Sequence, residues 1–232
     1  YLRISRWEDA HAMFEKLISL DQKNARAWYY KGICLSAMNL HEDALAAFEN
    51  AIVFDDTCAV AWYNKARELG SLKQYEDAIP ALDRALALQP ALLEAAYQKG
   101  LMLSILNRND EAVAAFDLAV TGGMNTGELH YYRGNSFMQI GRWQDALDAF
   151  NRTIDLSPLD AAAWNEKGLA LSRLGNNSLA VSAFDKALEL DPKSAQTAFG
   201  RGLALSGLGN DDEAIRSFSH ALELDSTLYE AA

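Results

Sequence analysis

The sequence predicts an all-α solenoid of helix-turn-helix repeats, because residues recur at a fixed interval, each interval carries two helical patterns, and no segment reads clearly as a strand. The recurrence has a period of 34 residues in a chain of 232. One series that follows this period consists of Trp28, Trp62, Ala96, His130, Trp164 and Ala198. Self-similarity at this period is typical of arrays in which each unit packs mainly on its neighbours. Such an architecture favours binding over catalysis.

Residues 25–58 illustrate how one interval is built. Apolar residues recur at spacings of three and four from residue 28 to 38 and again from residue 44 to 52, which is the pattern of a helix face. A turn is expected near Asn39 and Leu40. Gly32 on the first helix and Ala44 on the second are small enough to let the two backbones approach closely. The interval therefore predicts a helical hairpin.

The period divides the chain into complete and partial repeats. The six full repeats are expected at residues 25–58, 59–92, 93–126, 127–160, 161–194 and 195–228. Residues 1–24 read as the second half of an earlier repeat, and residues 229–232 as the opening of a later one. We therefore expect one array over residues 1–232, excerpted from a longer protein.

These positions carry a resemblance to the tetratricopeptide repeat (TPR) family. The family pattern is Trp, Leu-Gly, Tyr, Ala, Phe, Ala and Pro at fixed offsets, and one unit follows it with Trp164, Gly168, Leu171, Ala180, Phe184, Ala187 and Pro192. The resemblance covers almost the whole chain and implies a right-handed superhelix whose first helices line a concave groove. It implies a ligand in that groove but does not identify the partner.

Composition narrows the class of partner and site. The formal net charge is −11, from 32 acidic and 21 basic side chains, which argues against a nucleic-acid partner. No apolar run approaches the length of a membrane span, and the first residues lack a signal-peptide pattern. Cys34 and Cys58 stand at different repeat positions, so neither a disulfide nor a zinc site is expected. A reducing cytoplasm is the default expectation, with no cofactor and no metal.

Two segments depart from the repeat pattern. Residues 121–127, which we call the seam, contain Gly122, Gly123 and Gly127, and should shorten the preceding helix and loosen the join. The seam is either a tolerated loop variation or a hinge between the two halves. Pro80 falls inside a predicted second helix, where it removes one backbone hydrogen bond and should bend the helix.

The groove implied by the resemblance places once-per-repeat positions on its wall. The residues expected to contact a ligand there are Tyr29, Ile33, Tyr63, Arg67, Tyr97, Leu101, Tyr131, Asn135, Met138, Asn165, Leu169, Arg173 and Phe199. Apolar and aromatic members would supply affinity, while Arg67, Asn135 and Arg173 would fix the register of the ligand. The wall is close to neutral, so the negative charge is expected on the outer face and in the loops.

Two series on the first helices have alternative interpretations. The tyrosines Tyr29, Tyr63, Tyr97 and Tyr131 either grip a peptide or serve packing alone. The series Lys31, Lys65, Lys99, Arg133, Lys167 and Arg201 is called the cation ladder here. Its stems can cover apolar surface while Glu49, Asp83, Asp117 and Asp185 pair with its charges. A basic stripe for an acidic ligand is the alternative interpretation.

More specific chemistry finds little support in the sequence. The Lys, Asn and Arg set with which some arrays of this family bind the carboxylate of chaperones is incomplete around Asn64 and Asn135. The four histidines occupy unrelated repeat positions, and acidic pairs such as Glu76-Asp77 stand at helix starts. His130 replaces a tryptophan and is expected to be a partly buried spacer.

These observations predict a non-catalytic scaffold that binds a peptide segment or a partner protein in a concave groove. One alternative is the targeting or regulatory arm of a larger enzyme or regulator whose active domain lies outside this sequence. The other is an array that associates with itself, end to end, through open terminal repeats.

Overall fold

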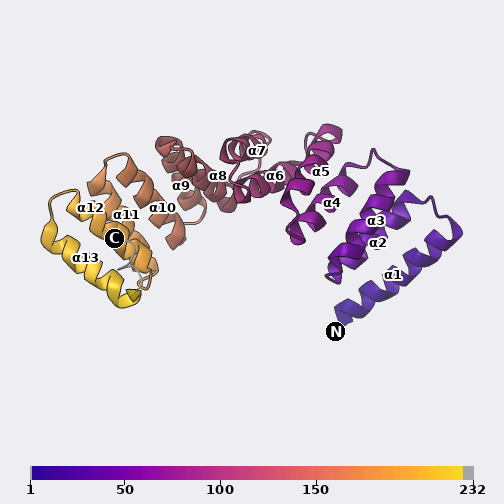
Figure 1. Ribbon diagram of the computed structural model, residues 1–232, viewed down its shortest axis with the longest axis horizontal. Coiled ribbons are helices and arrows are strands. Elements are labelled where there is room, and N and C mark those ends of the chain that lie inside the picture. The colour runs from indigo at the N-terminus through magenta and orange to yellow at the C-terminus, as the bar shows by residue number, and fades with distance from the viewer. Residues whose placement is uncertain (1, 227–232) are drawn as a thin grey trace. The chain divides into compact units, whose positions relative to one another are not determined.

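The structure, a computed structural model, describes residues 2–226 and contains thirteen α-helices and no strand over that range (Figure 1). The helices are α1 (Leu2–Leu20), α2 (Ala25–Ala37), α3 (His41–Phe54), α4 (Ala59–Ser71), α5 (Tyr75–Leu88), α6 (Leu93–Ile105), α7 (Asn109–Thr121), α8 (Gly127–Gln139), α9 (Trp143–Leu156), α10 (Ala161–Arg173), α11 (Asn177–Leu190), α12 (Ala195–Ser206) and α13 (Asp211–Leu224). The predicted all-α repeat architecture is confirmed. The predicted repeat opening at residues 229–232 lies outside the described residues.

The chain divides into two compact units, Tyr1–Met124 and Asn125–Ala232, called unit 1 and unit 2 here. In unit 1 the hairpins are α2 with α3, α4 with α5 and α6 with α7, and in unit 2 they are α8 with α9, α10 with α11 and α12 with α13. Within each unit, a first helix also packs against the second helix of the preceding repeat. The division falls at the seam. That the repeats form one array across it stays a prediction.

The close approach of the two helices in a hairpin depends on a glycine opposite a phenylalanine. A Cβ added at Gly32 would lie 2.7 Å from Cε1 of Phe48, and one added at Gly168 would lie 2.6 Å from the same atom of Phe184. Both rings are fully buried. The second repeat has Ala66 where the others have glycine, and Leu82 replaces the phenylalanine of the partner helix. A larger residue on one helix is thus matched by a smaller one on the other.

The turn inside each hairpin places one residue in the left-handed region of the backbone. In unit 1 these residues are Asn39, Lys73 and Asn107, and in unit 2 they are Gly141, Gly175 and Gly209. The amide of the residue that follows donates to a carbonyl near the end of the first helix, as Leu40 does to Leu35. Positive φ in this turn ends the first helix and lets the chain reverse.

The cation ladder connects successive repeats, as its packing interpretation predicts. Lys65 Nζ lies 2.9 Å from Glu49 Oε1, and Arg201 Nε lies 2.6 Å from Asp185 Oδ1. Lys99 pairs with Asp83 in the same way. Each carboxylate belongs to the second helix of the preceding repeat, so three of the four predicted partners are confirmed.

Lys167 differs from these ladder members because Asn151 stands where its carboxylate partner would be. Its ammonium group lies 4.9 Å from the centre of the Trp164 ring. Burial lowers the pKa of Lys167, and the more distant Asp155 opposes that shift. A cation therefore occupies this position of the ladder even in the repeat where the preceding second helix has no carboxylate to pair with it.

The two departures from the repeat pattern have modest local effects. Helix α7 ends at Thr121 and is 13 residues long, one fewer than each of the other second helices from α3 onward, as the glycines of the seam predict. Gly123 has a φ of +106°, which favours glycine. Helix α5 continues without interruption through Pro80. Helix α1 begins at Leu2, earlier than its match to later repeats predicts, because no turn residue precedes Trp7.

Two buried polar side chains were not expected from the pattern. His130 is only 6% exposed, so its interpretation as a partly buried spacer was wrong in degree, and burial lowers its pKa. Its Nε2 lies 2.9 Å from Oδ1 of Asn125. Glu68 is 2% exposed, and its two carboxylate oxygens contact Ser36 Oγ and His41 Nδ1, each at 2.7 Å. This carboxylate is therefore satisfied inside the protein.

Candidate functional site

The predicted ligand-binding residues lie on the first helices of the two units, and we call these sets the first-helix faces. The face of unit 1 lies on α2, α4 and α6 and consists of Tyr29, Ile33, Tyr63, Arg67, Tyr97 and Leu101. The face of unit 2 lies on α8, α10 and α12 and consists of Tyr131, Asn135, Met138, Asn165, Leu169, Arg173 and Phe199. Arg67 and Arg173 are exposed and Asn165 is buried, while the other members are half-buried. That each face lines a groove stays a prediction.

The aromatic rings of both faces pack on the hairpin core with part of their surface still accessible. The centroid of the Tyr29 ring lies 5.8 Å from that of Phe48, and Tyr131 lies 6.0 Å from Phe150. Phe199 lies 5.4 Å from Phe218 in the same arrangement. These rings therefore serve packing, and their half-buried state also leaves surface for a ligand.

A hydrogen-bonded cluster joins two repeats on the face of unit 1. Asn64 on α4 is buried, and its Nδ2 donates to Val60 O at 2.8 Å and to the Tyr29 hydroxyl at 3.3 Å. Arg67 Nη1 donates to Asn64 Oδ1 at 3.2 Å. The guanidinium lies 5.9 Å from the centre of the Tyr63 ring. The cluster therefore holds the Arg67 guanidinium at the surface, beside the Tyr63 ring and linked through Asn64 to Tyr29.

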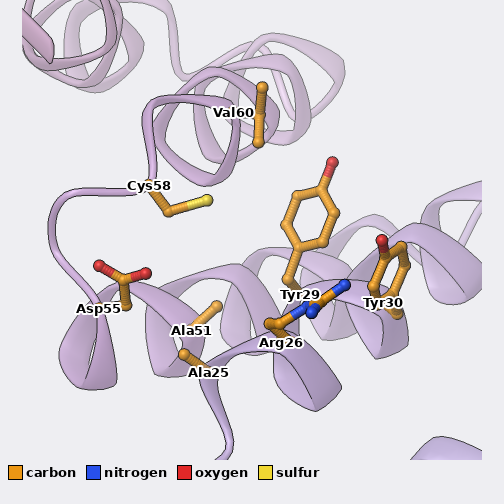
Figure 2. A pocket seen from close by; sticks show the side chains of 8 residues that line it. All are labelled: Ala25, Arg26, Tyr29, Tyr30, Ala51, Asp55, Cys58 and Val60. Atoms are coloured by element: carbon orange, nitrogen blue, oxygen red, sulfur yellow. The ribbon is translucent and has the colours of Figure 1, made fainter.

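A small cavity opens beside this cluster, between α2 and the start of α4 (Figure 2). Its volume is about 170 Å³. The residues that line it are Ala25, Arg26, Tyr29, Tyr30, Ala51, Asp55, Cys58 and Val60. Burial raises the pKa of Tyr29, so its hydroxyl remains a neutral donor and acceptor at the edge of this cavity. The cavity can accept a side chain that is mainly apolar, with polar groups at its rim.

The face of unit 2 has a different polar centre. Asn165 on α10 donates from Nδ2 to Oε1 of Glu166 at 3.2 Å. Burial raises the pKa of Glu166, and this hydrogen bond opposes the shift. Burial also raises the pKa of Tyr131, which is opposed by a hydrogen bond with Asn135 and reinforced by the charge of Glu166. The centre of this face is a partly desolvated carboxylate beside a neutral phenol.

The sequence prediction did not include Asn64 or Glu166 among the site residues. Both stand at the sixth position of their repeats, next to the fifth position, where tyrosine recurs. The hydrogen bond from Asn64 to Tyr29 shows that this sixth position can face the fifth position of the preceding repeat, and the charge of Glu166 at the same position raises the pKa of Tyr131. A count extended by one position would have found them. The prediction also placed Asn165 on the wall open to a ligand, whereas its side chain is buried and its amide donates to Glu166.

Residues 2–226 hold neither a metal-binding cluster nor a helix able to cross a membrane. No three His, Cys, Asp or Glu side chains converge there as a metal site requires. None of the helices in that range combines the length and apolar character needed to cross a membrane. Cys34 is a buried free thiol, and Cys58 is a half-buried one.

Comparison with known families matches nearly the entire chain. Three sequence models described as tetratricopeptide repeat match residues 1–57, 131–195 and 166–228, residues 59–92, and residues 93–121. No curated protein matches the sequence significantly.

Solved structures of the same kind resemble this chain. YrrB, described as a TPR protein with an unusual peptide-binding site, is 27% identical, with a TM-score of 0.72 over 78% of this chain and 93% of its own. MamA is 25% identical, with a TM-score of 0.67 over 71% of this chain and 96% of its own. The C-terminal part of a TPR repeat-containing protein from Cytophaga hutchinsonii is 15% identical, with a TM-score of 0.74 over 96% of this chain and 92% of its own. The last likeness concerns the fold alone.

Proposed function

Since this chain belongs to the tetratricopeptide repeat family, we propose that it is a non-catalytic scaffold that binds a peptide segment or a partner protein through the first-helix faces of its units. The similarity to YrrB, whose structure is described as containing a peptide-binding site, supports a peptide as the ligand. The cavity beside the face of unit 1 and the exposed arginine on each face are consistent with this kind of ligand.

One observation carries the proposal, namely that arginines on the first-helix faces lack a carboxylate partner. In residues 2–226, Arg67 contacts Asn64 and the Tyr63 ring, and Arg173 lies 5.7 Å from the centre of the Trp143 ring. The ladder cations Lys65, Lys99 and Arg201, in contrast, are paired with carboxylates. An exposed arginine beside an aromatic ring is available to an incoming ligand.

The experiment that tests this proposal uses peptides selected from a random displayed library against the full chain. Their affinity is then measured for a double variant, Tyr97→Ala with Tyr131→Ala, which removes one half-buried ring from each face. Ring truncation at a binding hot spot costs at least about 2 kcal/mol, which corresponds to roughly thirtyfold weaker binding. Circular dichroism verifies that the helices remain.

The matched control is the double variant Val53→Ala with Leu179→Ala. Like the first double variant, it changes one residue in each unit, but it truncates exposed apolar side chains on the second helices α3 and α11. We expect it to leave peptide affinity unchanged. Equal loss in both double variants, or failure to select any peptide, would rule out binding through the first-helix faces.

Self-association is a second candidate, favoured by the exposed side of α13. Ile215 on that helix is 62% exposed, whereas Ile79 at the same position of its own repeat is 7% exposed. An open apolar side of this kind can accept a helix from another copy. Light scattering over a range of concentrations tests this candidate, since a constant monomer mass excludes it.

A further inference from the structure

Glu166 is an acidic side chain in unit 2 that lacks the partners a partly buried carboxylate normally has. It lies on α10 and is half-buried. Its only hydrogen bond among residues 2–226 comes from Asn165 Nδ2, at 3.2 Å, and no basic side chain in that range forms a salt bridge with it. A charge removed from water without such partners is unfavourable, so an external partner would be bound readily.

Glu68 in unit 1 shows what a satisfied carboxylate looks like in the same protein. It is more deeply buried than Glu166, yet each of its oxygens has its own partner, Ser36 for one and His41 for the other. Glu166 has one donor for two oxygens. Deeper burial thus does not leave a carboxylate without partners in this protein, and Glu166 differs from Glu68 in having one donor fewer among the described residues.

Asn165 provides a second, independent sign of an incomplete site. It is only 7% exposed, and its Oδ1 is buried with no hydrogen-bond donor among the described residues. This oxygen belongs to the same amide group that donates to Glu166, so the unpartnered acceptor lies beside the carboxylate. Buried acceptors without donors are rare in folded proteins, and each one calls for an explanation such as an absent ligand.

Tyr131 on the neighbouring α8 completes the arrangement. Its half-buried ring rests on Phe150, 6.0 Å away between centroids. Burial raises the pKa of Tyr131, and the negative charge of Glu166 on α10, which contacts α8, raises this pKa further. The surroundings of Glu166 therefore present a carboxylate, an amide oxygen and a phenol.

We propose that Glu166, held by Asn165 and flanked by Tyr131, binds the ammonium or guanidinium group of a lysine or arginine side chain. The carboxylate supplies the charge, and the phenol supplies an aromatic surface and a hydroxyl for the stem and head of the cation. Asn165 positions Glu166 through its Nδ2 and leaves its Oδ1 as a further acceptor for the cation. That the cation belongs to a peptide rests on the proposed function, whereas the cation site itself does not.

The test uses a small probe, N-acetyl-lysine methylamide, titrated into the full chain with its side-chain amides observed by NMR. The uncharged analogue N-acetyl-norleucine methylamide has the same backbone and nearly the same stem. We expect saturable shifts of the Asn165 side-chain amide with the lysine probe and none with the norleucine probe. A lysine probe that shifts this amide no more than the norleucine probe would overturn the cation site.

Two variants separate a specific site from general attraction to an acidic protein. Glu166→Gln keeps the shape and removes the charge, and should weaken lysine-probe binding about tenfold, as loss of a charge-assisted hydrogen bond does. Glu128→Gln makes the same change at an exposed position of α8 in the same unit and should not alter binding. Equal weakening in both variants would show that the attraction is not specific to Glu166.

The outcome also separates this site from the proposed scaffold function. If selected peptides bind the first-helix faces but show no preference for lysine or arginine, and the probe does not bind, the scaffold stands and the cation site fails. If the probe binds but no peptide is selected, the cation site stands and the peptide scaffold fails.

Discussion

Unit 1 and unit 2 have the same helical hairpins but opposite chemistry at the centre of their first-helix faces. In unit 1, Asn64 donates to the Tyr29 hydroxyl and supports the exposed cation of Arg67. In unit 2, the sixth repeat position carries Glu166, whose charge raises the pKa of Tyr131, so the centre of that face offers acceptors while Arg173 is exposed elsewhere on it. The scaffold fixes where these side chains stand, and their identity sets the charge that a ligand meets.

The units also differ in their hairpin turns. At the position with positive φ, unit 1 has Asn39, Lys73 and Asn107, whereas unit 2 has Gly141, Gly175 and Gly209. Glycine adopts this conformation without a steric cost because it has no Cβ, whereas the Cβ of another residue comes too close to the backbone. The same backbone is therefore reached with more local strain in unit 1, above all at Lys73.

The strongest test of the shared scaffold is truncation of the phenylalanine that faces the glycine. Phe48→Ala in unit 1 and Phe184→Ala in unit 2 should each lower the free energy of unfolding by about 3–5 kcal/mol, because both rings are fully buried. Urea denaturation followed by circular dichroism measures this change. Costs that differ severalfold between the two variants would show that the hairpins are not equivalent.

A smaller effect is expected from the glycine side of the same contact. Gly32→Ala places a Cβ 2.7 Å from the Phe48 ring and should cost about 1–3 kcal/mol through overpacking. Adding Phe48→Leu should recover part of that loss, because the second repeat combines Ala66 with Leu82 in the same places. The double variant is compared with Phe48→Leu alone. Additive losses would mean that the Ala66 and Leu82 pairing does not compensate in size.

The repeat fold could be predicted closely because its determinants recur six times. The spacing of Gly32, Ala44 and Phe48 predicted the helical hairpin, and the glycines of the seam predicted the shorter α7. The start of α1 was less predictable, since residues before Trp7 contain no turn signal and a helix can extend through them. The burial of His130 was also underestimated, because a hydrogen bond to Asn125 compensates one ring nitrogen.

The candidate site was harder to predict, because its polar centres occur once and depend on contacts between repeats. The tyrosine series was visible as a recurrence, but Asn64 and Glu166 differ from one another and from other residues at their position. Their importance follows from distances to neighbours about 35 residues apart, as between Asn64 and Tyr29. Period alone cannot reveal which single substitution leaves a buried acceptor without a donor.

The turns offer a reciprocal test of the difference between the units. Lys73→Gly should stabilise the protein by about 1 kcal/mol, because it relieves the steric cost of a side chain at a φ of +61°. Gly175→Lys, at a φ of +78°, should destabilise it by a similar amount. Thermal unfolding measures both changes. Unchanged stability in both variants would mean that the turns tolerate either residue equally.

The subtlest prediction concerns the pH dependence caused by Glu166. Burial raises its folded-state pKa above the ordinary value of 4.5, so between these two values the folded chain keeps a proton that the unfolded chain has released. The free energy of unfolding must then fall as the pH rises through that window. Glu166→Gln removes this penalty, so it should be more stable than the wild type at neutral pH, by a margin that disappears below about pH 4.5.

The margin should be small, because Glu166 is only partly removed from solvent and keeps the Asn165 hydrogen bond. Urea unfolding at several pH values measures it, with Glu128→Gln as the control at an exposed position of the same unit. A margin for Glu166→Gln that does not change with pH would contradict the desolvated carboxylate. Because a bound cation favours the ionised carboxylate, saturating lysine probe should lower the pKa of Glu166 and so restore the stability of the wild type relative to the variant at neutral pH.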